Sequence, residues 1–321
     1  MIFEKIAFVG FGLIGSSMAR AIAEAGTVTK KITAIDTNPE YLEQIVALGI
    51  ADKVTDDFAD GVKDADLVII AVPVGSYEMV AKQIAPSLKE GAIVTDVGSV
   101  KQSIIEQVAK HLPDHVHFIP GHPIAGTAHS GPQAGFADLF KNRWCILTPL
   151  PDSDIRAVEK ITQLWEAIGS NIEIMDASRH DLILAITSHL PHLIAYTIVG
   201  TATDLEDHMQ DDVITFSAGG FRDFTRIAAS NPVMWRDIFM NNRDAVLEVL
   251  QRFTEDLTAL QRAIRWGDDK FLEDVFTRTR DVRRKVIDAG QADYATASGT
   301  RERTPPVEGR QERSGSAVSG K

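Results

Sequence analysis

The first half of the chain alternates short apolar runs with segments whose apolar positions recur every three or four residues. This alternation is typical of a parallel β-sheet whose strands are joined by crossover helices. We expect the strands at Lys5 to Val9, Lys31 to Ile35, Leu67 to Val72, Ile93 to Asp96, His117 to Ile119 and Trp144 to Thr148. After a break at Pro149 and Pro151, we expect a helix at Asp154 to Ile168 and a strand at Ile172 to Met175 that completes the same sheet.

From residue 177 onwards the strand pattern stops and helical spacing takes over. Asn231 followed by Pro232 indicates an N-cap with proline at the first helical position, and Gly267 indicates a helix end. Residues 291–321 are rich in Ser, Gly, Pro and charge and have no periodic apolar face, which predicts a disordered tail. The long helices are expected at Ser178 to Asp207, Pro232 to Trp266 and Asp268 to Ile287.

Charge and composition narrow the classes of function. With 33 basic and 45 acidic residues among 321, the formal net charge is −12, which argues against a nucleic-acid or anionic-membrane surface. An anionic ligand therefore has to be bound by a few basic side chains positioned at its site. The single cysteine, Cys145, excludes an intramolecular disulfide and a cysteine-based zinc cluster, and we interpret it as a small core residue in a reducing compartment, the cytoplasm.

Membrane insertion and secretion are not expected. The N-terminus has no basic region ahead of an apolar stretch and a cleavage site. The longest apolar stretch, Leu182 to Val199, is interrupted by four residues unsuited to a membrane span: Ser188, His189, Pro191 and His192.

A glycine-rich turn follows the first expected strand and opens a helix at Ser16 to Glu24. Gly10 permits a tight turn, Gly12 lets the backbone approach a pyrophosphate, and Gly15 lets helix and strand pack closely. The helix N-terminus then offers free N–H groups to the anion. The whole turn is therefore expected to bind a cofactor: Gly10, Phe11, Gly12, Leu13, Ile14 and Gly15.

Asp36 ends the second expected strand, at the distance from the glycines where a carboxylate accepts hydrogen bonds from the adenine-ribose hydroxyls. It would repel a 2′-phosphate, and neighbouring residues provide no arginine to hold one, so NAD is favoured over NADP. The alternative is a solvated aspartate at a strand end. Val72 and Pro73 lie at the end of another expected strand and are expected to pack against the cofactor. These features predict an α/β Rossmann-type nucleotide-binding domain over residues 1–176 and an all-α domain over residues 177–290.

Polar residues gather in four further places. One is the run from Asp96 to Lys101, where Ser99 lies near the nicotinamide end or caps the next helix. The second is the run Gly121 to Thr127, which contains His122. The others are two histidines in an apolar helix and the Gly219 to Arg226 segment between helices.

Together with the glycine turn, these motifs resemble the prephenate and arogenate dehydrogenases, the cyclohexadienyl dehydrogenases of tyrosine biosynthesis. The resemblance covers residues 1 to about 290. It implies that His122 bonds the ring C4 hydroxyl and takes its proton, that Ser99 helps to hold both, and that Arg226 binds a substrate carboxylate. It also implies that His189 and His192 line the substrate side of the cleft and that the helical domain forms a homodimer. Gly219 and Asp223 are expected to contribute to the substrate site.

Several alternatives remain at this point. His189 and His192 are otherwise core residues or two ligands of a zinc ion, although no nearby carboxylate completes the zinc pattern. Asp223 and Arg226 otherwise form an ordinary i,i+3 pair. The rival functions are a β-hydroxyacid dehydrogenase, which usually carries its proton on a lysine, and a regulator that binds NAD without turnover.

One position departs from the family. Many members carry an acidic residue where this chain has Ala128, so the contact by which that carboxylate gates the site is in doubt, and Asp223 is the candidate to replace it. The sequence leaves open whether prephenate or arogenate is preferred and whether tyrosine inhibits.

Overall fold

A six-stranded parallel sheet forms the centre of the N-terminal half. In the computed structural model, which describes residues 1–127, 129–203 and 219–288, the strand order is β3-β2-β1-β4-β5-β6. This is the order of dinucleotide-binding sheets, with the switch point between β1 and β4. Ile6 pairs with both Ile32 and Leu67. The strands are β1 (Ile6–Val9), β2 (Ile32–Ile35), β3 (Lys53–Thr55), β4 (Leu67–Ile70), β5 (Ile93–Asp96) and β6 (His117–Ile119).

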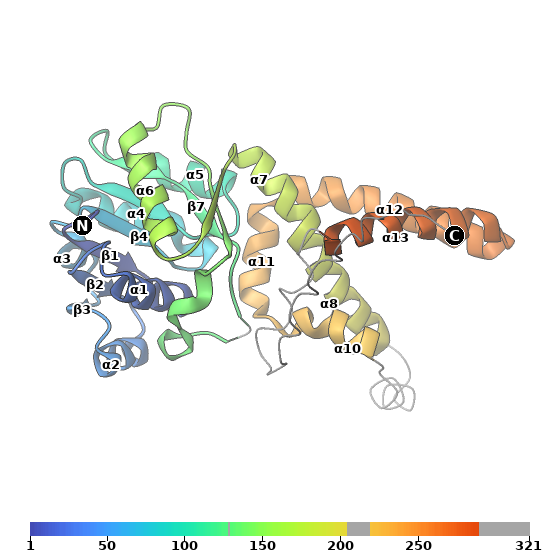
Figure 1. Ribbon diagram of the computed structural model, residues 1–321, viewed down its shortest axis with the longest axis horizontal. Coiled ribbons are helices and arrows are strands. Elements are labelled where there is room, and N and C mark those ends of the chain that lie inside the picture. Colours follow the sequence, from blue (N-terminus) through green and yellow to red (C-terminus); the bar gives the residue numbers. More distant parts are fainter. Residues whose placement is uncertain (128, 204–218, 289–321) are drawn as a thin grey trace, which may run out of the picture. The chain divides into compact units, whose positions relative to one another are not determined.

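Helices cover both faces of this sheet (Figure 1). They are α1 (Leu13–Ala25), α2 (Pro39–Leu48), α3 (Phe58–Val62), α4 (Tyr77–Ile84), α5 (Gln102–Ala109) and α6 (Ile155–Ala167), with 3₁₀ turns at η1 (Val74–Ser76), η2 (Ala85–Ser87), η3 (Pro132–Ala134) and η4 (Ala137–Phe140). Because both faces are covered, the central strands are apolar at every position rather than at alternate ones. That continuous apolar pattern is the reason why the sequence predicted them.

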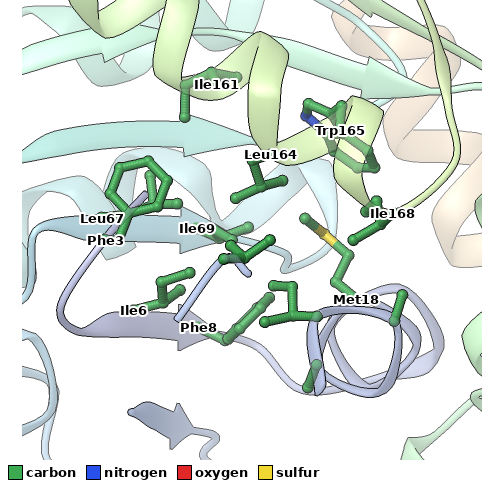
Figure 2. Close-up of a cluster of buried hydrophobic side chains, with 14 of the residues drawn as sticks. Phe3, Ile6, Phe8, Met18, Leu67, Ile69, Ile161, Leu164, Trp165 and Ile168 are labelled. Carbon is green, nitrogen blue, oxygen red and sulfur yellow. The ribbon is translucent and has the colours of Figure 1, made fainter. Parts of the chain in front are cut away.

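The core consists of one apolar layer on each face of the sheet. Figure 2 shows the first layer, in which Trp165 of α6 and Met18 of α1 approach Phe8 of β1 and its neighbours. In the second layer, alternate strand residues such as Val68 pack with α4 and α5, and Trp235 from the helical half joins them. Two elements that follow strands contact later helices: η1, after β4, contacts the helix Pro232–Asn241, and α5, after β5, contacts the helix Ala177–Leu184.

The prediction that the strands after residue 140 complete the main sheet was wrong. β8 (Trp144–Leu147) and β9 (Asn171–Ile174) form a separate three-stranded sheet with β7 (Gly121–Pro123), which runs antiparallel to β8. The main sheet ends at β6, and Pro120, which has no N–H to donate, separates β6 from β7. His122 thus lies on a strand, paired with Ile146.

The helical half begins at α7 (Ala177–Leu184) and includes a π-helical turn η5 (Ala185–His189), α8 (Leu190–Thr203), α10 (Gly219–Thr225), η6 (Arg226–Ala229), α11 (Pro232–Asn241), α12 (Arg243–Trp266) and α13 (Asp269–Asp288). The expected caps are confirmed, because the Asn231 side chain accepts from Val233 N–H and Met234 N–H, and Gly267 has a φ of 71° after α12.

The chain divides into two units, Met1–Thr254 and Glu255–Lys321, with the boundary inside α12. The helices up to Thr254 therefore belong to the same unit as the sheet. The proposed boundary between residues 176 and 177 stays a prediction, and the tail at 291–321 lies outside the described residues, as does the end of the helix expected to reach Asp207.

The π turn η5 has a local cause in the sequence. Pro191 has no N–H and its ring crowds the preceding turn, so the helix widens ahead of it, and Leu190 N–H donates to Ala185 O. Among the described residues, the helical segment Ala177–Thr203 is long and apolar enough to cross a membrane, with a mean hydropathy of 1.6. His180, Asp181 and His189 within it are nevertheless buried against other parts of the first unit.

Candidate active site

The glycine turn after β1 has the geometry of a phosphate-binding loop. Gly10 has a φ of 86°, and a Cβ there would lie 2.6 Å from Ala71 O. A Cβ on Gly15 would lie 2.7 Å from Gly10 O, so only glycine allows α1 to pack this closely. A Cβ on Gly12 would meet nothing within 4 Å, and no side chain caps α1 there. This open space at an uncapped helix N-terminus fits a pyrophosphate.

Asp36 is attached to the glycine turn through its carboxylate. Its Oδ2 accepts from Phe11 N–H at 2.9 Å, and its Oδ1 accepts from Asn38 N–H at 2.9 Å. The carboxylate is therefore fixed beside the turn at the end of β2, while its remaining lone pairs are available to ribose hydroxyls.

The other expected cofactor residues contribute in different ways. The side chain of Phe11 is fully buried against Phe8, with ring centroids 5.5 Å apart, so only its backbone faces the turn. Leu13 and Ile14 are half-buried against the core. Val72 is half-buried and Pro73 is exposed at the carboxyl end of β4, next to the switch point of the sheet.

His122 is joined by a chain of hydrogen bonds to an aspartate. His122 Nδ1 lies 2.8 Å from His180 Nε2, and His180 Nδ1 lies 2.8 Å from Asp181 Oδ1. All three side chains are buried, with 9% of His122 exposed. Burial, reinforced by His180 and Lys101, holds the pKa of His122 well below its ordinary value. His122 is therefore a neutral imidazole at neutral pH, which is the form that accepts a proton.

A buried ion pair fixes the backbone next to His122. Lys101 Nζ pairs with Asp96, donates to Gly121 O at 2.6 Å, and is fully buried. Asp96 in turn accepts from Gly121 N–H at 3.1 Å and from Gly98 N–H at 2.8 Å. Both backbone groups of Gly121 are thus bound, and the histidine that follows is positioned at the carboxyl end of β5.

His189 lies deep in the helical half. Asn242 Nδ2 lies 3.1 Å from His189 Nδ1 and also donates to Asp181 O at 2.9 Å. His189 Nε2 is buried with no hydrogen-bond partner in the described residues. Burial lowers the pKa of His189 to about 4. A buried N–H without a partner is costly, and a bound molecule would supply one.

His192 lies one turn further along α8 and stacks on Trp235, with ring centroids 3.6 Å apart. Its Nδ1 donates to Ser188 O at 2.8 Å. Burial lowers the pKa of His192, and the charge of Arg226 lowers it further. Arg226 itself is exposed at the start of η6, which packs against α8. These residues form an aromatic and cationic cluster.

The structure does not connect every expected residue to this site. Ser99 is half-buried and does not cap α5, which begins at Gln102. Instead Asp181 caps that helix from α7, accepting from Lys101 N–H at 2.8 Å and Gln102 N–H at 2.9 Å. Asp223 is exposed, and within residues 219–288 it forms no ion pair with Arg226. Gly219 begins α10, where its Cβ would lie 3.9 Å from Asp223 Oδ2. Ala128 lies outside the described residues.

Comparison with known proteins identifies the family. Residues 18–174 match the model described as prephenate dehydrogenase, nucleotide-binding domain, and residues 176–278 match prephenate dehydrogenase, dimerization domain. The chain belongs to the prephenate dehydrogenase family. It is 43% identical to the cyclohexadienyl dehydrogenase of Zymomonas mobilis, over 88% of this chain and 96% of that one.

Solved structures of the prephenate dehydrogenase family share the fold. The prephenate dehydrogenase of Aquifex aeolicus in complex with hydroxyphenyl propionate and NAD⁺ superposes with a TM-score of 0.81 at 33% identity, covering 88% of this chain and 98% of that chain. The arogenate dehydrogenase of Synechocystis gives 0.75 at 27% identity, covering 88% and 99%. The predicted resemblance, the α/β and helical fold class, and NAD as the cofactor of this dehydrogenase are therefore confirmed.

Sequence reasoning missed several residues around His122. His180 and Asp181 occur in an amphipathic helix with no motif around them, and Lys101 was noticed only as the end of the run that begins at Asp96. A signal existed for Lys101, because a lysine five residues after a strand-ending aspartate can pair with it. No comparable signal linked Asp181 to a helix end 80 residues earlier in the chain.

Proposed function

We propose that this chain catalyses the NAD-dependent oxidative decarboxylation of prephenate to 4-hydroxyphenylpyruvate, of arogenate to tyrosine, or of both, in tyrosine biosynthesis. The family match and the names of the relatives support the reaction class. The observation that carries the proposal for this chain is His122, a buried neutral imidazole held next to the carboxyl end of β5.

The reaction asks the protein for three things. It must position ring C4 at the nicotinamide, accept the C4 hydroxyl proton and hold an anionic side chain. NAD, when bound, takes the hydride. His122 takes the hydroxyl proton while the C4 oxygen becomes a carbonyl, and loss of CO₂ from the quaternary carbon then makes the ring aromatic. The proton returns to the oxygen, and aromatisation drives the reaction.

Substrate binding is assigned to the cluster at the helical side. Arg226 offers the bidentate cation that an anionic substrate requires in a chain of net charge −12. His192 and Trp235 supply a stacked aromatic wall, and the unpartnered Nε2 of His189 supplies a donor. Ser99 is proposed to hold the substrate hydroxyl together with His122, and Gly219 and Asp223 to border the site.

We assign Asp36 to the adenine-ribose hydroxyls, an assignment that predicts a preference for NAD over NADP. Its carboxylate is fixed against the glycine turn, and a 2′-phosphate would meet a negative charge there. The cytoplasm is the proposed location, because the single cysteine, Cys145, is buried and excludes an intramolecular disulfide, which fits a reducing compartment.

A homodimer formed through the helical domain is the proposed assembly. The matched model is named for dimerization. In the segment Ala177–Thr203 only 22% of the most apolar window is buried, although its mean hydropathy is 1.6. A second copy would cover such a surface. Sedimentation of a chain ending near Gly290 should give the dimer mass, whereas a fully active monomer would contradict this assembly.

The proposed reaction is tested with the full-length protein, NAD and each substrate in turn. We expect equal amounts of NADH and CO₂ from at least one of prephenate and arogenate, and the ratio of the two kcat/KM values gives the preference. NADH formation without CO₂, or no turnover of either substrate, would contradict the proposal.

A further inference from the structure

We infer that His180 and Asp181 fix the tautomer of His122, so that His122 Nε2 is the atom that takes the substrate proton. This inference rests on the proposed function, in which His122 is the base. It assigns a positioning role to two residues of α7 that do not themselves need to touch substrate.

The argument starts at Asp181, whose two oxygens face only donors. Oδ1 accepts from Lys101 N–H at 2.8 Å and Oδ2 from Gln102 N–H at 2.9 Å, at the N-terminus of α5. Backbone N–H groups can only donate, and the positive end of the helix dipole favours an anion at this place. Asp181 is therefore a carboxylate, and it can only accept from His180 Nδ1, 2.8 Å from its Oδ1.

The proton positions follow along the chain of rings. His180 Nδ1 carries a proton, and because burial lowers the pKa of His180, this ring is neutral and its Nε2 has a lone pair. That Nε2 lies 2.8 Å from His122 Nδ1, which must then donate. A neutral His122 that is protonated at Nδ1 keeps its lone pair at Nε2. In the opposite tautomer, two lone pairs would meet between the rings, and the N–H would occupy the position needed for the base.

His180 and Asp181 connect His122 by hydrogen bonds to both the sheet half and the helical half of the first unit. Asp181 belongs to α7, yet it caps α5, which follows the strand carrying Asp96. Asn242, which caps the C-terminus of α11, donates to Asp181 O at 2.9 Å. His180 is fully buried and Asp181 is 2% exposed, so water cannot replace either hydrogen bond. The orientation of His122 is thus set by a cross-element cap and not by its own strand alone.

The kinetic test compares two variants at His180. His180→Leu removes the acceptor, so we expect kcat to fall by roughly 10²-fold while KM for substrate and NAD changes by less than about threefold. His180→Gln places an amide oxygen near the lost Nε2 and should recover at least about tenfold of that loss. The matched control is His115→Leu, at an exposed turn, which should leave both constants unchanged. Equal activity of His180→Leu and the unmodified enzyme would overturn the inference.

A second readout does not depend on activity or on whether the His180 variants fold. Long-range ¹H–¹⁵N spectra of the full-length protein distinguish protonated from unprotonated ring nitrogens, and the His122 signals are those lost in His122→Asn. We expect a protonated Nδ1 and an unprotonated Nε2. A protonated Nε2 in the neutral ring would overturn the inference while leaving His122 as a candidate base. A normally active His122→Asn would instead contradict the role of His122 as the base, on which this inference rests.

Discussion

His189 makes the stability of this protein sensitive to mild acid. The folded chain holds this ring neutral, with a pKa of about 4, because the ring is buried and exposes only 1% of its surface. In the unfolded chain a histidine takes up its proton near pH 6.5. Between these values the unfolded state binds more protons than the folded state, so the free energy of unfolding falls as the pH decreases.

The size of the effect follows from the pKa difference. At about pH 5 the unfolded histidine is almost fully protonated and the folded one is not, which costs about 2 kcal/mol relative to about pH 7.5. The contribution of the neutral ring to the free energy of unfolding is complete above the pKa of the unfolded histidine and is lost progressively as the pH falls below that pKa. His189→Asn removes the titrating ring but keeps an oxygen that can accept from Asn242, so this variant should lose about 2 kcal/mol less between the two pH values.

The assay is urea unfolding of the full-length protein followed by circular dichroism, at both pH values and one protein concentration. Only the difference between pH values is compared, so any constant destabilisation by the substitution cancels. His115→Asn, at an exposed position, is the matched control and should show the same acid loss as the unmodified protein. If His189→Asn loses as much stability as that control, the burial argument for this ring is refuted.

Three further outcomes follow from the site. NAD should be favoured over NADP by at least about tenfold in kcat/KM, and Asp36→Ser should reduce that ratio. Equal use of both cofactors by the unmodified enzyme would contradict the assignment of Asp36 to the ribose hydroxyls. Arg226→Ala should raise KM for substrate by roughly 10- to 100-fold with little change in kcat, because a charged hydrogen bond contributes about 1.5–3 kcal/mol in both the ground state and the transition state. Arg252→Ala, on an exposed face, is the control. An unchanged KM in Arg226→Ala would contradict the assignment of Arg226 to the substrate carboxylate. Lys101→Met should lower the free energy of unfolding by about 3–5 kcal/mol, because it leaves Asp96 buried without its cation. Lys82→Met, at an exposed position, should lower it by less than about 0.5 kcal/mol. Similar losses in the two variants would contradict a stabilising role of the buried ion pair.

The sequence predicted those parts of the fold that local patterns determine. The central strands are apolar at every position, and the helix ends at Asn231 and Gly267 use side chains or backbone angles within a few residues. β7 was missed because Gly121 to Pro123 is too short for a pattern. The second sheet, β7-β8-β9, was missed because the sequence of a strand does not show which other strand it pairs with.

The site divides along the same line. The glycine turn, Asp36 and His122 were predicted because their chemistry lies in short motifs. The cap on α5 was not, because its acceptor, Asp181, comes 80 residues later in the chain than Lys101. His180 carries no motif at all, and its importance is visible only from the 2.8 Å contact with His122. Sequence patterns therefore identified the candidate reacting groups, whereas the residues proposed to orient them required the folded structure.

The most direct test of the account is the turnover of His122→Asn on prephenate and arogenate across the pH range. Because the pKa of His122 is held well below its ordinary value, the unmodified enzyme should keep its activity to well below pH 6.5, and the variant should lose this acidic limb. We predict that kcat falls by roughly 10²- to 10⁴-fold with a small change in KM. Near-normal turnover of both substrates by His122→Asn would contradict the account, because another group would then accept the proton.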